Sequence, residues 1–190
     1  NLMAGMSGEE RVDSTVLESA KSRIPWLIVN LFTAVMAAAV VANFESTIAK
    51  VVSLSSVMSI VTGMGGNAGT QSLTILCRGL SLGEVDKDNA FQIFFKEIIV
   101  GLLSGIVIGI IVAFGAWWFA SNPWFGLVAG LAMILNMLAA NIAGYLVPVI
   151  LKRLNIDPAL ASGVFVTTVT DCMGFFFFLG LAILFLPLLI

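Results

Sequence analysis

Long apolar runs constrain this 190-residue chain more than any other feature of its sequence. Five of them cover residues 25–44, 48–76, 91–119, 125–150 and 158–190. At about 1.5 Å per residue, roughly 20 helical residues cross the ~30 Å hydrocarbon core of a bilayer. Hydrophobic residues make up 59% of the chain and charged residues 11%, a balance far from that of soluble domains. The sequence therefore predicts an all-α integral membrane protein with five transmembrane helices.

The rest of the composition narrows the function classes. A net charge of −2 gives no basic surface for nucleic acid. The two cysteines, Cys77 and Cys172, lie in apolar contexts without paired spacing, which indicates neither a disulfide framework nor a zinc site. Because the chain has no histidine, any metal ion must be bound through oxygen atoms, and oxygen ligands suit hard cations such as Mg²⁺ and Ca²⁺.

Residues 1–23 form the only long polar stretch of the sequence, and we divide the chain into this stretch and a membrane domain at 24–190. Asp13 or Ser14 is expected to cap a helix here. Two interpretations remain open: a solvated linker helix, or a connector that transmits a signal from a preceding domain. Because the chain opens with Asn1 rather than Met, we expect it to be part of a longer protein.

The basic residues predict the orientation of the membrane domain. Eight of the nine fall on one side if the N-terminus, the 78–96 region and the loop after residue 150 share that side. These eight are Arg11, Lys21, Arg23, Arg78, Lys87, Lys96, Lys152 and Arg153. Lys50 falls on the opposite side. Since short cytoplasmic loops are enriched in Lys and Arg, we expect a cell-membrane protein with a cytoplasmic N-terminus and an external C-terminus.

The stretch GMGGNAGTQS, residues 63–72, interrupts the second apolar run with glycines and polar side chains. In a membrane such a segment must pack against protein or line a water-filled cavity. Close helix–helix packing is one interpretation, because glycines let helices approach. The side-chain oxygens of Asn67 and Thr70, together with the backbone carbonyls expected to be open at Gly63 and Gly66, favour the other interpretation, a pore lining.

A second polar stretch, TTVTD at residues 167–171, lies deep in the last apolar run. A carboxylate at such a depth costs about 2.5–3.5 kcal/mol on insertion scales, so Asp171 is expected to face a cavity, a partner or an ion. Thr167 shares its helix face one turn earlier, and Thr168 and Thr170 flank that face. A protonated Asp171 bonded to a neighbouring helix is the alternative. We predict that the two polar stretches face each other across an ion pathway.

A single acid per chain supplies too few ligands for Mg²⁺, which binds one or two carboxylates and keeps several waters. A homodimer with a central axis brings two Asp171 carboxylates together, and a divalent cation between them relieves their repulsion. Small residues on the third and fourth runs offer helix contacts. In the third run, the small residues that recur every four positions are Gly101, Gly105, Gly109 and Ala113, and we expect this stripe to be a packing face. The prediction is a homodimeric pore selective for divalent cations.

Taken together, these motifs resemble the membrane domain of MgtE-type magnesium channels. The resemblance rests on residues 63–72, on TTVTD followed by Gly174, on Asp-Pro-Ala at 157–159 and on RIPWL at 23–27, and it covers essentially the whole chain. It implies a homodimeric cation channel with five helices per subunit, whose pore is formed by the second and fifth helices.

The same resemblance implies a site and a regulator. Asp171 of both subunits would hold a hydrated Mg²⁺, and the positions implied to lie near that ion are Gly63, Gly66, Thr70, Gly163 and Thr167. Cytoplasmic magnesium-sensing domains would precede this chain, joined by a helix that plugs the pore and of which residues 1–23 are the remnant. Ser59 and Val164 depart from the family, which commonly has proline at these positions, and this leaves the shape of the pore open.

The predicted function is thus a channel that conducts Mg²⁺ into the cytoplasm, and not an enzyme. Mn²⁺, Co²⁺ and Ca²⁺ stay open as further permeant ions. An ion-coupled secondary transporter is the alternative, although such carriers usually contain an internal repeat and the sequence has none that we detect. An intramembrane aspartyl protease needs two acids in one catalytic site, which this chain would supply only as a dimer.

Overall fold

The computed structural model describes residues 13–86, 88–158 and 162–190, and within these ranges the chain is helical and contains no strand. The helices are α1 (Val16–Ala42), α2 (Glu45–Lys50), α3 (Ser53–Leu82), α4 (Ala90–Ala120), α5 (Pro123–Arg153), α6 (Ser162–Leu184) and α7 (Leu186–Leu189). The all-α prediction is confirmed. Part of the predicted connector at 1–12, with Arg11, and also Lys87 and Ala159, lie outside the described residues.

The first helix starts slightly later than the sequence predicted. Its N-cap is Thr15, not Asp13 or Ser14 as expected. The reason is Glu18, whose carboxylate accepts hydrogen bonds from the backbone N–H of Thr15 at 2.9 Å and from its hydroxyl at 2.8 Å. Pro25, the first residue of the first apolar run, lies inside the helix, where it removes one backbone hydrogen bond. The helix nevertheless runs without a break across the boundary predicted at residue 24.

The second apolar run forms two helices. The short α2 is followed by α3, which continues through Arg78, two residues beyond the apolar run that ends at residue 76. Gly83 ends α3 with a φ of 71°, in the left-handed region that favours glycine. The glycine-rich stretch is continuous helix, so the carbonyls of Gly63 and Gly66 are engaged in helical hydrogen bonds and are not open as the sequence suggested.

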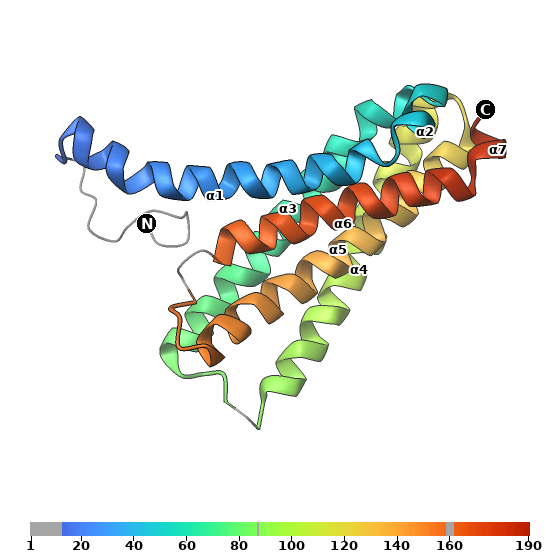
Figure 1. Cartoon of the computed structure of the whole chain (residues 1–190). Coiled ribbons are helices and arrows are strands. Elements are labelled where there is room, and N and C mark those ends of the chain that lie inside the picture. The colour runs from blue at the N-terminus through green and yellow to red at the C-terminus, as the bar shows by residue number, and fades with distance from the viewer. Residues whose placement is uncertain (1–12, 87, 159–161) are drawn as a thin grey trace.

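The small-residue stripe of α4 faces α5, the helix that follows it in an antiparallel hairpin (Figure 1). A Cβ added at Gly105 would lie 3.2 Å from the Cα of Ile134, and one at Gly109 would lie 2.9 Å from the carbonyl oxygen of Gly130. These distances leave room for glycine and little else. The packing interpretation is therefore confirmed, and because the contact is made within the chain, this stripe is not open to a second copy.

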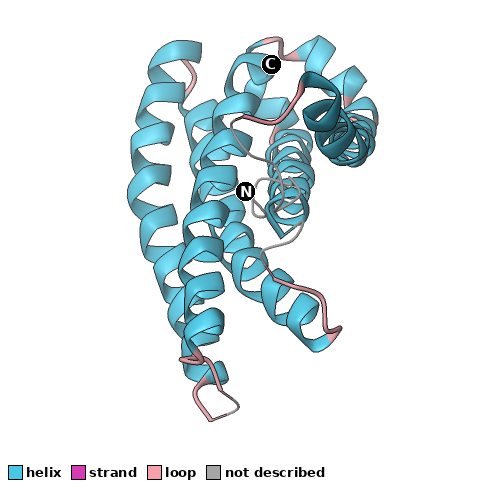
Figure 2. Ribbon diagram, turned by 90° about the vertical axis from the view of Figure 1, so that its left-hand side faces the viewer, coloured by secondary structure: helices cyan, strands magenta, loops and turns pink. Residues whose placement is uncertain are grey.

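The helix α5 lies at the centre of the bundle, with α3, α4 and α6 packed around it (Figure 1). Figure 2 shows the same helical bundle turned by 90°. Its side chains Phe125 and Met133 are buried in the main apolar core. The helix α6 contacts both α3 and α5, whereas α1 packs mainly against α6 at the edge of the bundle. Large apolar side chains such as Phe32 on α1 and Ile111 on α4 are exposed, as expected of a surface that faces lipid.

Four of the described helices, α1, α4, α5 and α6, are long and apolar enough to cross a membrane. The multi-pass membrane character predicted from the sequence is thereby supported. The helix α3 has 30 residues, enough by length, but its serines, threonines and glycines lower its hydropathy, and it does not belong to these four. Its role as the fifth membrane span stays a prediction.

Candidate functional site

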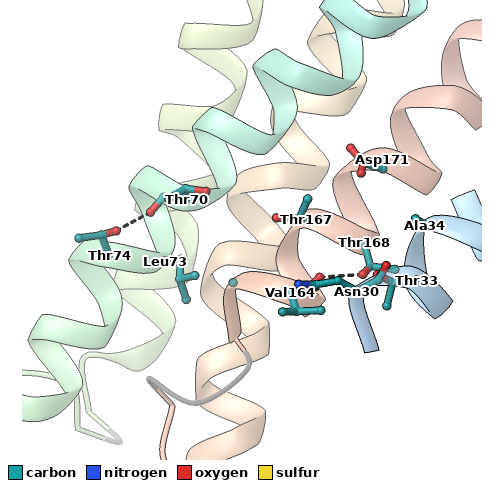
Figure 3. Close-up of a pocket in the computed structure, with 11 residues that line it drawn as sticks. Asn30, Thr33, Ala34, Thr70, Leu73, Thr74, Val164, Thr167, Thr168 and Asp171 are labelled. Carbon is teal, nitrogen blue, oxygen red and sulfur yellow. Dashed lines mark hydrogen bonds between the residues drawn. The ribbon is translucent and has the colours of Figure 1, made fainter. Parts of the chain in front are cut away.

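A cavity of about 700 Å³ lies where α1, α3 and α6 meet (Figure 3). The α3 stretch contributes Thr70 to its wall, and the α6 stretch contributes Thr167, Thr168 and Asp171. The other lining residues are Asn30, Thr33 and Ala34 of α1, Leu73 and Thr74 of α3, and Gly163 and Val164 of α6. The structure thus brings the two polar stretches of the sequence to one cavity within a single chain.

Asp171 supplies the negative charge of the cavity. It is half-buried on α6, and none of the described residues that line the cavity is basic. In the described ranges, the structure records no hydrogen bond and no ion pair for its side chain. The alternative of a hydrogen bond to a neighbouring helix is therefore not realised in this part of the chain. An acid without a partner inside a membrane helix calls for a cation, water or a second subunit.

Three threonine hydroxyls of the cavity wall on α3 and α6 are oriented by their own helices. Thr70 donates to the carbonyl oxygen of Gly66 at 2.8 Å, and Thr74 donates to that of Thr70 at 2.7 Å. On α6, Thr168 donates to Val164 at 2.7 Å in the same way. Because each hydroxyl proton is committed to the backbone, the lone pairs of these oxygens remain for other donors. Such a wall can accept hydrogen bonds from the water shell of a cation.

Four of the predicted pore residues do not line this cavity. Gly63 and Asn67 are exposed on α3. Thr170 is fully buried and donates to the carbonyl oxygen of Thr167 at 2.9 Å. Gly66 lies beside it, since a Cβ added there would be 3.9 Å from the Thr170 hydroxyl oxygen. Their assignment to a pore stays a prediction that requires a second subunit.

The glycine-rich stretch has two faces. One packs against a neighbouring helix and the other borders the cavity, which are the two interpretations that the sequence left open. On the packed face, a Cβ at Gly65 would overlap the amide of Asn136, whose nitrogen donates to the carbonyl oxygen of Val61 at 2.8 Å. On the other face, Thr70 borders the cavity. Helix packing and cavity lining therefore coexist in one helix.

Sequence reasoning missed the wall that α1 contributes. Asn30, Thr33 and Ala34 are spaced i, i+3 and i+4, which places them on one helix face. Two polar side chains at this spacing in an otherwise apolar run were the available signal. Thr74 was also missed, although it follows Thr70 by one helical turn just beyond the motif.

The ligand inventory of a single chain is small. Among the described residues, no group of three or more histidine, cysteine, aspartate or glutamate side chains gathers where it could hold a metal ion. The cavity offers one carboxylate and several neutral oxygens. This set fits a cation that keeps most of its water, and it does not by itself form a dehydrated metal centre.

Fold and cavity together define a class: a multi-pass helical membrane protein with an oxygen-lined cavity around one acid. Within that class, the chain belongs to the MgtE family, because the family model described as "Divalent cation transporter" matches residues 58–181. The resemblance seen in the sequence is thereby confirmed.

Three curated relatives carry the name "Magnesium transporter MgtE". The protein of Enterococcus faecalis is 36% identical over 186 residues, which is 97% of this chain and 40% of that protein. That of Bacillus subtilis is 33% identical over 92% of this chain and 39% of its own length. That of Thermus thermophilus is 32% identical over 85% of this chain and 36% of its own length. The chain thus spans about two fifths of the length of these relatives.

Proposed function

We propose that this chain is the membrane domain of a homodimeric channel that conducts Mg²⁺ into the cytoplasm. The observation that carries the proposal is Asp171, an acid with no recorded partner in the described chain, on the wall of a cavity where Thr70 and Thr168 already donate their hydroxyl protons to the backbone. The relatives are named magnesium transporters, which agrees with the proposal.

The chemistry of Mg²⁺ explains why such a wall suits it. Mg²⁺ gives up its water reluctantly and is bound through one or two carboxylates and retained waters. Two Asp171 carboxylates, one per subunit, would hold the hydrated ion, and its waters would donate to oxygens such as that of Thr70. Gly63, Gly66 and Asn67, which are outside the cavity of the single chain, would lie on the shared pore. Mn²⁺, Co²⁺ and Ca²⁺ are competing cargoes with the same oxygen preference.

The proposal includes an arrangement in the membrane. The helix α3 is the fifth span, the N-terminus is cytoplasmic and the C-terminus is external, as the distribution of Lys and Arg favours. Cytoplasmic regulatory domains precede the chain, and residues 1–23 connect them to the pore.

The function is tested by Mg²⁺ flux into liposomes that contain the intact chain or its Asp171→Ala variant. The expected result is a concentration-dependent influx in the former and a loss of that influx in a variant that folds equally well. Equal flux in both would overturn the assignment of Asp171. A flux that requires a gradient of protons or Na⁺ would instead indicate an ion-coupled carrier.

The dimer is tested by crosslinking in membranes. With Cys77 and Cys172 replaced by alanine, a cysteine at Thr167, beside the proposed ion site, should form disulfide-linked pairs. A cysteine at Trp118, which is 90% exposed on α4, is the control and should stay unlinked. A chain that conducts Mg²⁺ while it remains monomeric would contradict the shared pore.

A further inference from the structure

A second acid lies inside a membrane helix, away from the cavity. Glu97 of α4 is 5% exposed. Its Oε2 accepts a hydrogen bond from the hydroxyl of Ser72 on α3 at 2.7 Å. Its Oε1 lies 3.6 Å from Nζ of Lys96, a side chain that is 60% exposed. A buried acid is costly unless it is paired and hydrogen-bonded, and the proposed channel function gives this one no task.

Ser72 belongs to the glycine-rich stretch but points away from the cavity. At 3.6 residues per turn, position 72 lies about 200° around α3 from both Thr70 and Thr74, which line the cavity. Ser72 is 3% exposed, and its hydroxyl oxygen also lies 3.4 Å from the carbonyl oxygen of Asn141 on α5. Three helices therefore meet at one hydroxyl, on the side of α3 opposite the cavity.

Two glycines make room for this junction. A Cβ added at Gly144 of α5 would lie 2.7 Å from the Cβ of Ser72, and one added at Gly101 of α4 would lie 3.0 Å from the Cβ of Asn141. Elsewhere α3 and α4 make few contacts, and both pack extensively on α5. The bond between Ser72 and Glu97 is thus a directional link between two helices that otherwise scarcely touch.

We infer that Glu97 is a positioning residue for the cavity: through Ser72 it fixes the rotation of α3 and, with it, the place of Thr70 and Thr74 opposite Asp171. A short hydrogen bond to a carboxylate depends on direction and is stronger than one between neutral groups. The geometric part of this inference, that the bond fixes the rotation of α3, does not depend on which ion is transported. The ion-dependent part, that this rotation affects Mg²⁺ occupancy, rests on the proposed function.

The geometric part is tested by thiol reactivity, which requires no transport. In a chain with Cys77 and Cys172 replaced by alanine, single cysteines are placed on α3 at Thr74, in the cavity wall, and at Ile75, an exposed neighbour. Their rates of reaction with a water-soluble thiosulfonate are compared with and without Ser72→Ala. A rotation of α3 changes the ratio of the two rates severalfold, whereas a general loosening of the fold raises both rates together.

Matched variants separate the bond from other effects. Glu97→Ala should change the ratio as Ser72→Ala does, and Glu97→Gln should restore it, because an amide oxygen can accept the same hydroxyl. Ser81→Ala is the control on the same helix, since Ser81 donates to the carbonyl oxygen of Cys77 at 2.8 Å and contributes no link between helices. Lys96→Gln should also leave the ratio unchanged, because an exposed ion pair contributes little.

The ion-dependent part is read from Mg²⁺ flux in liposomes. Ser72→Ala should raise the half-saturating Mg²⁺ concentration about fivefold, a change that corresponds to about 1 kcal/mol, with the maximal flux per folded protein kept. Adding Glu97→Ala should cause no further rise, because both changes remove the same bond. If the intact chain shows no Mg²⁺ flux, the proposed function is wrong. The thiol reaction rates would still test the role of Glu97. An unchanged rate ratio in folded Ser72→Ala protein would overturn the inference, and this variant decides the matter even if Glu97→Ala does not fold.

Discussion

Asp171 and Glu97 are both acids within membrane-spanning helices, yet their surroundings differ. Glu97 is almost fully buried, accepts a hydrogen bond from Ser72 and pairs with Lys96. Asp171 is half-buried, borders a cavity, and has no recorded partner among the described residues. Both lie in helices long and apolar enough to cross a membrane, Glu97 near the start of α4 and Asp171 near the middle of α6. Their partners also differ, and on this difference we assign the satisfied acid to helix positioning and propose the unsatisfied one for an ion.

The largest expected effect is that of Asp171→Asn, which keeps the size and an oxygen ligand but removes one negative charge per subunit. At an effective dielectric constant of about 20, a unit charge about 5 Å from a divalent ion contributes on the order of 6 kcal/mol before desolvation and screening. Because about 1.4 kcal/mol corresponds to a factor of ten, even a fraction of this energy weakens Mg²⁺ occupancy by orders of magnitude. Mg²⁺ titration and flux in liposomes measure the loss, and monovalent leak should persist or rise.

The matched control for this prediction is Glu97→Gln, which also removes one negative charge from a membrane helix. If partners rather than charge separate the two acids, Glu97→Gln should keep near-normal Mg²⁺ affinity. Equal losses in the two variants would mean that the total charge of the bundle sets affinity, and the comparison would fail. Near wild-type affinity in a folded Asp171→Asn dimer would falsify the ion site itself.

The next effect concerns the packed face of α3, on which the positioning of the cavity also depends. Gly65→Ala places a methyl group on the amide of Asn136 and should lower the free energy of unfolding by about 1–3 kcal/mol. Gly63→Ala is the control on the same helix, because a Cβ there meets nothing within 4 Å. It should be neutral or slightly stabilising, since alanine favours helix over glycine by about 1 kcal/mol.

Thermal unfolding in detergent, followed by the loss of the folded peak in size-exclusion chromatography, measures both glycine variants. Equal stability of Gly65→Ala and Gly63→Ala would show that the bundle can shift away from Asn136. In that case α3 would not be fixed by packing on this face, and the link between Ser72 and Glu97 would have to hold it alone.

The sequence predicted the helices well because membrane length and hydropathy are local properties, read directly from runs such as 91–119 and 125–150. It also singled out Asp171 and Thr70, since polar groups stand out in apolar surroundings. It could not assign the two faces of the glycine-rich stretch, because which face packs depends on neighbours distant in sequence, such as Asn136. Glu97 was visible only as a charge near the start of a helix, since its partner Ser72 lies 25 residues away.

The smallest expected effect is the difference in Mg²⁺ affinity between a variant that loses a cavity hydroxyl and one that loses a buried hydroxyl. Thr70→Val removes an oxygen that borders the cavity, and Thr170→Val removes one that is fully buried between helices. A neutral hydrogen bond to the water shell of an ion is worth about 1 kcal/mol, so Thr70→Val should weaken Mg²⁺ affinity about fivefold. Thr170→Val should weaken it less, because within the chain the hydroxyl it removes donates to the carbonyl of Thr167, 2.9 Å away on the same helix.

Both variants keep the shape of the side chain, so Mg²⁺ titration of the two proteins in parallel isolates the oxygen atom. A larger loss in Thr170→Val than in Thr70→Val would place the ion between α3 and α6, near Gly66, and away from the cavity. The neutral oxygens of the cavity wall would then not bind the water shell of the ion. Asp171 would instead act together with buried polar groups, as Glu97 does with Ser72. The difference between the two acids would in that case be one of degree, set by how many neighbours each has.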